Sequence, residues 1–328
     1  MKNIELPRRV LVGEGAVDEV ADVISKLGLS GKSAVICDEN TRGIAGEKIA
    51  GQIKSELVDS ATPWNAVESL REARFLVAVG GGSVIDAVKI AAKNLAVPFV
   101  SVPTAASHDG IASPLASVKG EKAYSVRTSC PLAVIADTKI IAEAPKKLLS
   151  AGCADAISNY TAVLDWKLAA KERGEYYGDY AAALSALSAE IIMANADKAL
   201  SDVSMVVEAL ISSGVAIGIA GSSRPCSGSE HLFSHTLDLI CEKPALHGEQ
   251  CGVGAILMAC LHEAEWELVR DSLKKVNAPT NAKQLGIPDE KILEALTKAH
   301  TIRNRYTILR NGLTEQKARE LAEKTKVI

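Results

Sequence analysis

The stretch VAVGGGSVIDAVK, residues 77–89, decides the fold class of this chain. A short apolar strand pattern ends in three glycines, and a helical pattern follows at once. Backbone that must come close to a phosphate favours glycine, and the free amides at the start of a helix attract an anion. The stretch lacks the third glycine of a GxGxxG turn and the GK[ST] of a P-loop. A plain strand–helix turn is therefore the alternative to a nucleotide-binding turn.

Apolar stretches on both sides of this turn predict a parallel sheet. We expect strands at residues 33–39, 74–80, 98–103 and 132–138. Helical patterns such as TRGIAGEKIAGQI and SVIDAVKIAAKNL lie between them. Strand–helix–strand repetition with doubly apolar strands is typical of a parallel sheet covered on both faces. Further on, SPLASVKGEKAYSVRT alternates around KGEK and predicts a hairpin.

The second part of the chain has a different pattern. Long segments rich in Ala, Leu, Glu and Lys, such as residues 146–173 and 290–309, carry almost no strand signal. The apolar run at residues 205–221 is short for a membrane span and contains Glu208, so it predicts a buried core helix. The sequence therefore predicts an α/β Rossmann-like parallel-sheet domain at 1–143 and an all-α helical domain at 144–328.

Length, charge and cysteine usage limit the kind of protein. A chain of 328 residues exceeds the usual size of a single core, so two domains are expected. A net charge of -3 gives no electrostatic reason to bind nucleic acid or an anionic membrane. Seven scattered cysteines without a CxxC pair favour free thiols in a reducing compartment. We expect a cytoplasmic protein without membrane insertion.

Polar residues follow the predicted strands where α/β sheets bind ligands. In SVPTAASHDGIASP, residues 101–114, the small polar side chains are placed to meet a cofactor, although an ordinary polar loop is the alternative. Asp38 at the end of an earlier strand could bind a ribose 2′-hydroxyl and favour NAD, or it could be a turn residue. Arg42 could accept a 2′-phosphate, so we expect both NAD and NADP to be usable.

The histidines gather in SGSEHLFSHTLDLICEKPALHGEQ, residues 227–250, which holds three of the six in the chain. His231 and His235 are four apart and share one face of a predicted helix, a spacing that lets two imidazoles reach one metal. His247 follows after a break. Two imidazoles and a carboxylate suit Zn²⁺ acting as a Lewis acid. Spacing leaves the full set open among His231, His235, His247, Asp155, Glu230 and Glu249.

Five stretches together resemble a known family. They are GGGSVIDAVK, PTAASHDGIASP, DAISNYTAVLDW, SRPCSGSEHLFSH and LHGEQCGVG, in this order along most of the chain. With them the chain resembles the glycerol-1-phosphate dehydrogenases, in the superfamily of iron-activated alcohol dehydrogenases, glycerol dehydrogenases and dehydroquinate synthases. One position departs from the family pattern, because Ala154 stands where a glycine usually precedes the metal aspartate.

The resemblance implies roles for particular residues. It implies that Asp155, His231 and His247 hold the metal, Zn²⁺ in this prediction. His235 and Asp109 are implied to contact the substrate, and Asp155 to contact both substrate and metal. The implied dinucleotide site consists of Gly81, Gly82, Ser83, Val84, Ile85, Asp86, Thr104, Ala105, Ala106, Ser107 and Ser113.

The resemblance also implies a reaction: dihydroxyacetone phosphate would be reduced to sn-glycerol 1-phosphate with NADH or NADPH, towards archaeal-type phospholipids. A glycerol dehydrogenase acting on an unphosphorylated polyol is the nearest alternative. Dehydroquinate synthase and an inactive metal- or nucleotide-binding protein are others. Arg224 and Lys89 are candidates for binding the substrate phosphate. A homo-oligomer is the expected assembly.

Overall fold

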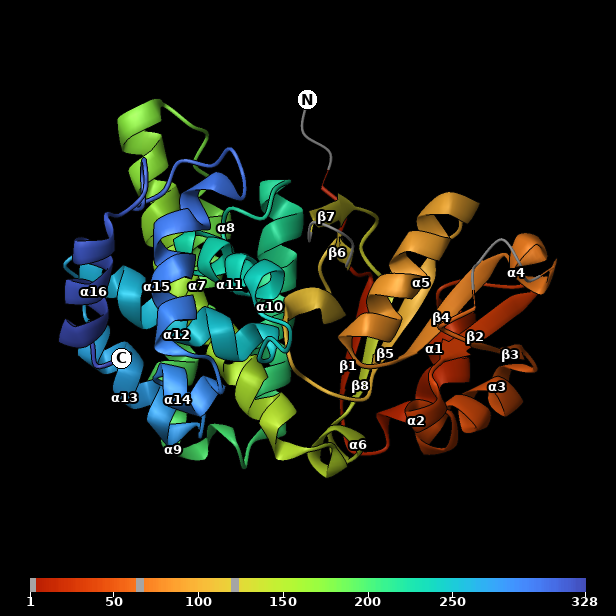
Figure 1. The fold of residues 1–328 in the computed structure, drawn as a ribbon. Coiled ribbons are helices and arrows are strands. Elements are labelled where there is room, and N and C mark those ends of the chain that lie inside the picture. Colours follow the sequence, from red (N-terminus) through yellow and green to blue (C-terminus); the bar gives the residue numbers. More distant parts are fainter. Residues whose placement is uncertain (1–3, 63–67, 119–123) are drawn as a thin grey trace.

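The computed structural model describes residues 4–62, 68–118 and 124–328, and a twisted sheet forms one side of it while helices form the other (Figure 1). The sheet has six described strands in the order β1-β8-β5-β4-β2-β3, and all neighbouring pairs are parallel. Its strands are β1 (Arg9–Gly13), β2 (Ser33–Cys37), β3 (Glu56–Asp59), β4 (Phe75–Gly80), β5 (Phe99–Pro103) and β8 (Ala133–Asp137). The expected strands correspond to β2, β4, β5 and β8 and are confirmed.

Helices cover both faces of this sheet. They and the short turns of this part are η1 (Ala16–Glu19), α1 (Val20–Lys26), α2 (Glu39–Thr41), η2 (Arg42–Gly46), α3 (Glu47–Ile53), α4 (Glu68–Glu72), α5 (Gly82–Leu95), η4 (Asp109–Ile111) and α6 (Thr138–Glu143). Val77 belongs to a core cluster with Val20 of α1 and Ile49 of α3. The next residue along β4, Ala78, belongs to the cluster that contains Val88 of α5. Alternation along the strand thus buries both faces, as predicted.

A two-stranded antiparallel hairpin, β6 (Leu115–Val118) and β7 (Tyr124–Arg127), lies against α5. The hairpin confirms the prediction, although its KGEK turn lies outside the described residues. Two buried α5 side chains hold it in place. Asp86 Oδ2 accepts from the Ser117 amide at 2.9 Å, and Lys89 Nζ donates to the Leu115 carbonyl at 2.6 Å.

The rest of the chain, from α6 onward, is helical. Its helices are α7 (Lys146–Arg173), α8 (Asp179–Ala194), α9 (Ala196–Ala199), α10 (Val203–Ala220), α11 (Ser229–Ile240), α12 (His247–Leu261), α13 (Trp266–Lys275), α14 (Ala282–Leu285), α15 (Asp289–Lys298), η5 (Ala299–Thr301) and α16 (Glu315–Lys324). The long helix α7 packs against α8, α10, α11 and α12. The apolar helix α10 is long enough to cross a membrane, but 61% of it is buried inside the protein, as expected of a core helix.

One predicted helical segment was too long. Residues 290–309 were expected to be helical, but α15 ends at Lys298 and residues 302–314 form a loop. The Ile308 amide donates to Asp165 Oδ1 at 2.6 Å instead of continuing a helical ladder. A buried carboxylate on α7 therefore holds this loop in place. The division into domains at residues 143 and 144 stays a prediction.

Candidate functional site

Three helices bring together the side chains that were predicted to hold a metal. Asp155 lies on α7, His231 on α11 and His247 at the first position of α12. One ligand atom from each of them, and the sulfur of Cys251, lie within 4.8 Å of one another. The rings of His231 and His247 have centroids 4.9 Å apart, and His247 Nε2 lies 3.8 Å from Asp155 Oδ1. Spacing had not indicated Cys251, which lies one helical turn after His247.

The chemistry of these groups fits a divalent cation. Asp155 Oδ1 is buried without a hydrogen-bond partner, which a native structure rarely tolerates. Burial raises the pKa of Asp155 well above its usual range, and the carboxylate of Asp109 adds to the shift. Burial also lowers the pKa values of His231 and His247 well below their usual range. Both imidazoles are therefore neutral and can each offer a nitrogen lone pair to a metal. A carboxylate and two neutral imidazoles form a typical donor set for Zn²⁺.

Neighbouring polar groups fix the orientation of the two imidazoles. His231 Nδ1 lies 3.0 Å from Glu230 Oε1, and His247 Nδ1 lies 3.2 Å from the Ser234 hydroxyl. Burial and the nearby Asp165 carboxylate raise the pKa of Glu230 to about 7. Outer hydrogen bonds of this kind leave the opposite ring nitrogen of each histidine for a metal. Glu230, which spacing offered as a possible ligand, instead supports His231.

Two glycines allow the helices to approach so closely. A Cβ on Gly248 of α12 would lie 2.0 Å from the Ala151 carbonyl oxygen of α7. A Cβ on Gly152 of α7 would lie 2.1 Å from the Ala106 carbonyl oxygen of the loop after β5. Asp155 itself lies inside the uninterrupted helix α7, with Ala154 fully buried before it. The alanine in place of the family's glycine is therefore compatible with helical backbone at this point.

The two residues implied to contact substrate lie beside this group. The amide of Asp109 donates to Asp155 Oδ2 at 3.1 Å, and burial raises the pKa of Asp109. The His235 ring stacks on the ring of His247 with centroids 5.6 Å apart. His235, Asp238 and His247 form a second group whose ligand atoms lie within 4.8 Å of one another. Asp155, His231 and His247, which were predicted to hold the metal, are called the metal group below. His235 is thus close enough to act beside the metal group or to join it.

Arg303 is a functional candidate that the sequence did not indicate. Its Nη2 lies 3.2 Å from His235 Nε2. A guanidinium only donates, so His235 Nε2 accepts this bond and the ring proton lies on Nδ1. The arginine belongs to the loop that was expected to be helical. The only signal in the sequence was the basic cluster RNRY at residues 303–306.

The residues implied to bind the dinucleotide lie at the start of α5 and in the loop after β5. Gly81 precedes α5 without a side-chain cap, so the first amides of α5 are open to an anion. The Thr104 amide donates to the Gly80 carbonyl at 3.1 Å, which joins the loop after β5 to the glycine turn. A Cβ on Gly82 would lie 1.9 Å from His108 Nε2, so a larger residue there would require the His108 side chain to move. The side chains of Val84, Ile85, Ala105 and Ala106 are buried.

Three of the charged residues considered from the sequence already have partners. Lys89 is fully buried and also binds Asp86 Oδ1 at 3.0 Å. Arg224 donates to the Tyr306 carbonyl at 2.8 Å and pairs with Glu175. Both are therefore poorly placed to bind a substrate phosphate. Asp38 caps α2, since its Oδ1 accepts from the Thr41 amide at 2.8 Å, which favours the turn interpretation.

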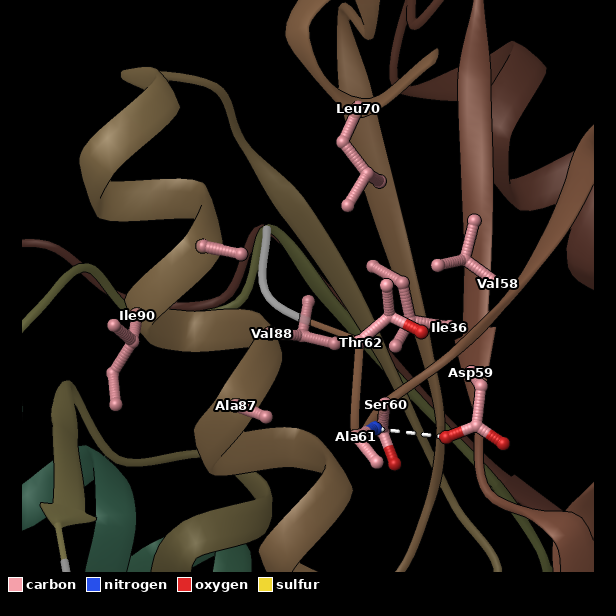
Figure 2. Close-up of a pocket in the computed structure, with 11 residues that line it drawn as sticks. Ile36, Val58, Asp59, Ser60, Ala61, Thr62, Leu70, Ala87, Val88 and Ile90 are labelled. Carbon is pink, nitrogen blue, oxygen red and sulfur yellow. Dashed lines mark hydrogen bonds between the residues drawn. The ribbon is translucent and has the colours of Figure 1, made fainter. Parts of the chain in front are cut away.

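A pocket of about 230 Å³ lies between α5 and the carboxyl ends of β2 and β3 (Figure 2). Its lining is largely apolar, with Ile36, Val58 and Val88 pointing into it, and Asp59 accepts a hydrogen bond from the Ala61 amide at its edge. Its described lining contains no lysine or arginine and none of the metal group. This pocket is therefore unsuited to a phosphate.

The sequence model of the iron-containing alcohol dehydrogenases matches residues 11–145 of this chain. Solved structures with this fold include a glycerol dehydrogenase from Schizosaccharomyces pombe, with a TM-score of 0.78 at 19% identity, covering 100% of this chain and 94% of that one. A probable glycerol dehydrogenase from Sinorhizobium meliloti has a TM-score of 0.79 at 21% identity and covers 100% of both chains.

Full-length relatives define the family more closely. The chain is 52% identical to the glycerol-1-phosphate dehydrogenase [NAD(P)+] of Methanosarcina mazei, with 100% of this chain and 97% of the relative covered. It is 50% identical to the protein of the same name from Thermococcus kodakarensis, with 99% and 98% covered. The chain belongs to the glycerol-1-phosphate dehydrogenase family.

Proposed function

We propose that this protein reduces dihydroxyacetone phosphate to sn-glycerol 1-phosphate with NADH or NADPH, for archaeal-type phospholipid synthesis. The observation that carries the proposal is the buried group of Asp155, His231 and His247 in a chain 52% identical to a glycerol-1-phosphate dehydrogenase. The protein would act as a cytoplasmic homo-oligomer. The free thiols of its seven cysteines support a reducing compartment.

Asp155, His231 and His247 are the proposed ligands of one divalent cation, Zn²⁺ in this proposal. When bound, the cation supplies Lewis-acid stabilisation of negative charge on the substrate oxygen. Glu230 and Ser234 keep the two imidazoles in a fixed orientation. Cys251 stays outside the ligand set, because a catalytic zinc site needs an open position for substrate.

Residues 81–86, 104–107 and Ser113 are the proposed dinucleotide site. The open amides at the start of α5 suit the pyrophosphate. Val84, Ile85, Ala105 and Ala106 have buried side chains, so they would contact the dinucleotide through their backbone groups. Because Asp38 caps α2, it gives little preference for the ribose 2′-hydroxyl. We therefore expect turnover with both NADH and NADPH.

The reaction adds a hydride to the carbonyl carbon and a proton to its oxygen. The hydride comes from the nicotinamide. His235 carries its ring proton on Nδ1, because Nε2 accepts from Arg303. We propose that His235, or a water beside it, takes part in supplying the proton that completes the alcohol. Asp109, held next to Asp155, orients the substrate.

The proposal is tested by NADH oxidation with metal-replete protein, comparing dihydroxyacetone phosphate with dihydroxyacetone and resolving the stereochemistry of the product. We expect strong preference for the phosphate and formation of sn-glycerol 1-phosphate. Preference for bare dihydroxyacetone would instead assign the protein to the glycerol dehydrogenases. Formation of the sn-3 isomer would exclude the proposed reaction while leaving the metal and dinucleotide sites standing.

A further inference from the structure

A cationic pocket of about 480 Å³ lies at the end of α7 and along the loop after η5. Its lining includes the guanidinium groups of Arg173, Arg303 and Arg305, the carboxylate of Glu175 and the imidazole of His300. Basic groups outnumber the single carboxylate, and that carboxylate already pairs with Arg224. A pocket with this balance of charge suits an anion.

The arginines of this region differ in what they contact. Arg305 donates to the Ser227 carbonyl and, at 2.7 Å, to the Ser223 hydroxyl. The Arg173 guanidinium lies over the ring of Tyr306, 4.6 Å from its centre. Arg303 both lines the pocket and contacts His235, whose ring stacks on His247 of the metal group. Arg303 therefore connects the cationic pocket to the place of the reaction.

The arginines around this pocket are not fully balanced by negatively charged groups. Burial and the neighbouring guanidiniums of Arg224 and Arg303 lower the pKa of Arg305 to about 10. Burial also lowers the pKa of Arg303. A bound dianion would relieve both the desolvation and the mutual repulsion of these groups.

The loop that carries Arg303 is firmly anchored. Its Ile308 amide binds Asp165 Oδ1 at 2.6 Å, and its Tyr306 carbonyl accepts from Arg224 at 2.8 Å. Asp165 also accepts from the Ser229 amide at the start of α11, the helix of His231 and His235. The buried carboxylate of Asp165 thus fixes the loop of residues 302–314 relative to α11. A loop that is already fixed loses less conformational entropy when it binds a ligand.

We propose that Arg303 binds the phosphate of the substrate and makes the enzyme select a phosphorylated triose. The inference rests on the proposed function. In dihydroxyacetone phosphate the phosphate is attached, through one oxygen, to the carbon next to the carbonyl. The group that binds it must therefore lie close to the reacting carbon, and Arg303 lies beside His235. A planar guanidinium matches the oxygens of a phosphate with two parallel hydrogen bonds.

The test compares Arg303→Gln with the wild-type enzyme, both metal-replete. We expect kcat/KM for dihydroxyacetone phosphate to fall by about 100-fold or more, because a charged partner is lost, whereas kcat/KM for dihydroxyacetone changes only a few-fold. The kcat/KM of Arg303→Lys for dihydroxyacetone phosphate should lie between those of Arg303→Gln and wild type. Lysine keeps the positive charge but lacks the planar guanidinium that makes two parallel hydrogen bonds. Arg310→Gln is the matched control, because it removes the same charge from an exposed position in the same loop and should leave both values unchanged.

A binding measurement separates failure of this inference from failure of the proposed function. Calorimetry with inorganic phosphate should show binding to wild type and to Arg310→Gln, and its loss in Arg303→Gln. That result would support the phosphate site even if dihydroxyacetone phosphate were not turned over. Equal losses with both triose substrates and unchanged phosphate binding would mean that Arg303 acts only through His235. Circular dichroism and metal content confirm that the variants are folded, and a folded Arg303→Gln with an unchanged substrate preference would overturn the assignment.

Discussion

The position of His235 is compatible with two roles, that of a metal ligand and that of a proton-transfer group. It stacks on His247 and belongs to a group that could hold a metal, yet its Nε2 is engaged by Arg303. We predict that His235→Ala lowers kcat with dihydroxyacetone phosphate by about 100-fold or more, as expected for loss of a proton-transfer group. Metal content measured by atomic emission should stay at the wild-type ratio. Loss of metal in this variant would make His235 a ligand and would reject its proposed role.

Individual site residues could be predicted to different extents. Spacing showed that two histidines share one helix face but left the ligand set open, and the resemblance pointed to the three residues that the structure brings together. Arg303 could not be found in this way, because its contact with His235 joins positions 68 residues apart. The burial of Lys89 could not be predicted either, because the hairpin that covers its helix face is a separate segment of the chain. Pairwise contacts between distant segments leave no local pattern in a sequence.

At the scale of elements, the site depends on how closely α7 and α12 approach. Gly248→Ala would place a methyl group where the Ala151 carbonyl oxygen lies, so we predict a loss of about 1–3 kcal/mol in the free energy of unfolding. The displaced helix would also move His247, and metal affinity should fall. Urea unfolding followed by circular dichroism, together with a metal titration, measures both effects.

The matched control is Gly51→Ala in α3, where a Cβ would meet nothing within 4 Å. There the substitution should raise the free energy of unfolding by about 0.5–1 kcal/mol, because alanine loses less backbone entropy in a helix than glycine does. A Gly248→Ala protein as stable as wild type and with unchanged metal affinity would show that the two helices can separate without harm to the site.

The elements that sequence reasoning missed share a physical feature. β1 and β3 are the two edges of the described sheet, and both are short and partly exposed. Each begins with a charged residue, Arg9 in β1 and Glu56 in β3, which none of the four central strands does. The helix predicted to continue past Lys298 ends there, and the loop that follows is held by a hydrogen bond from the Ile308 amide to Asp165. Edge strands and helix ends depend on tertiary partners, whereas buried strands are evident from their own composition.

At the scale of the whole molecule, the fold class followed from the order of its patterns. Alternating strands and helices followed by helices alone predicted the arrangement seen in Figure 1. A core cluster that includes Ile36, Val88, Leu210 and Ile256 nevertheless runs from the sheet into the helices. Sequence patterns therefore indicate the two kinds of architecture but not how continuous the core between them is.

This continuity connects the proposed metal site to the stability of the entire chain, because its three proposed ligands lie on α7, α11 and α12. We predict that a chelator lowers the melting temperature by about 5 °C or more at pH 7.5, since a ligand that binds only the folded state stabilises it. The effect should shrink towards pH 5. Without metal, burial raises the pKa of Asp155, so at lower pH a proton competes with the cation for this carboxylate.

Differential scanning calorimetry of Asp155→Asn provides the control, because that variant should melt at one temperature with or without chelator. A chelator effect that persisted in Asp155→Asn, or that grew towards pH 5, would locate the stabilising metal elsewhere in the molecule.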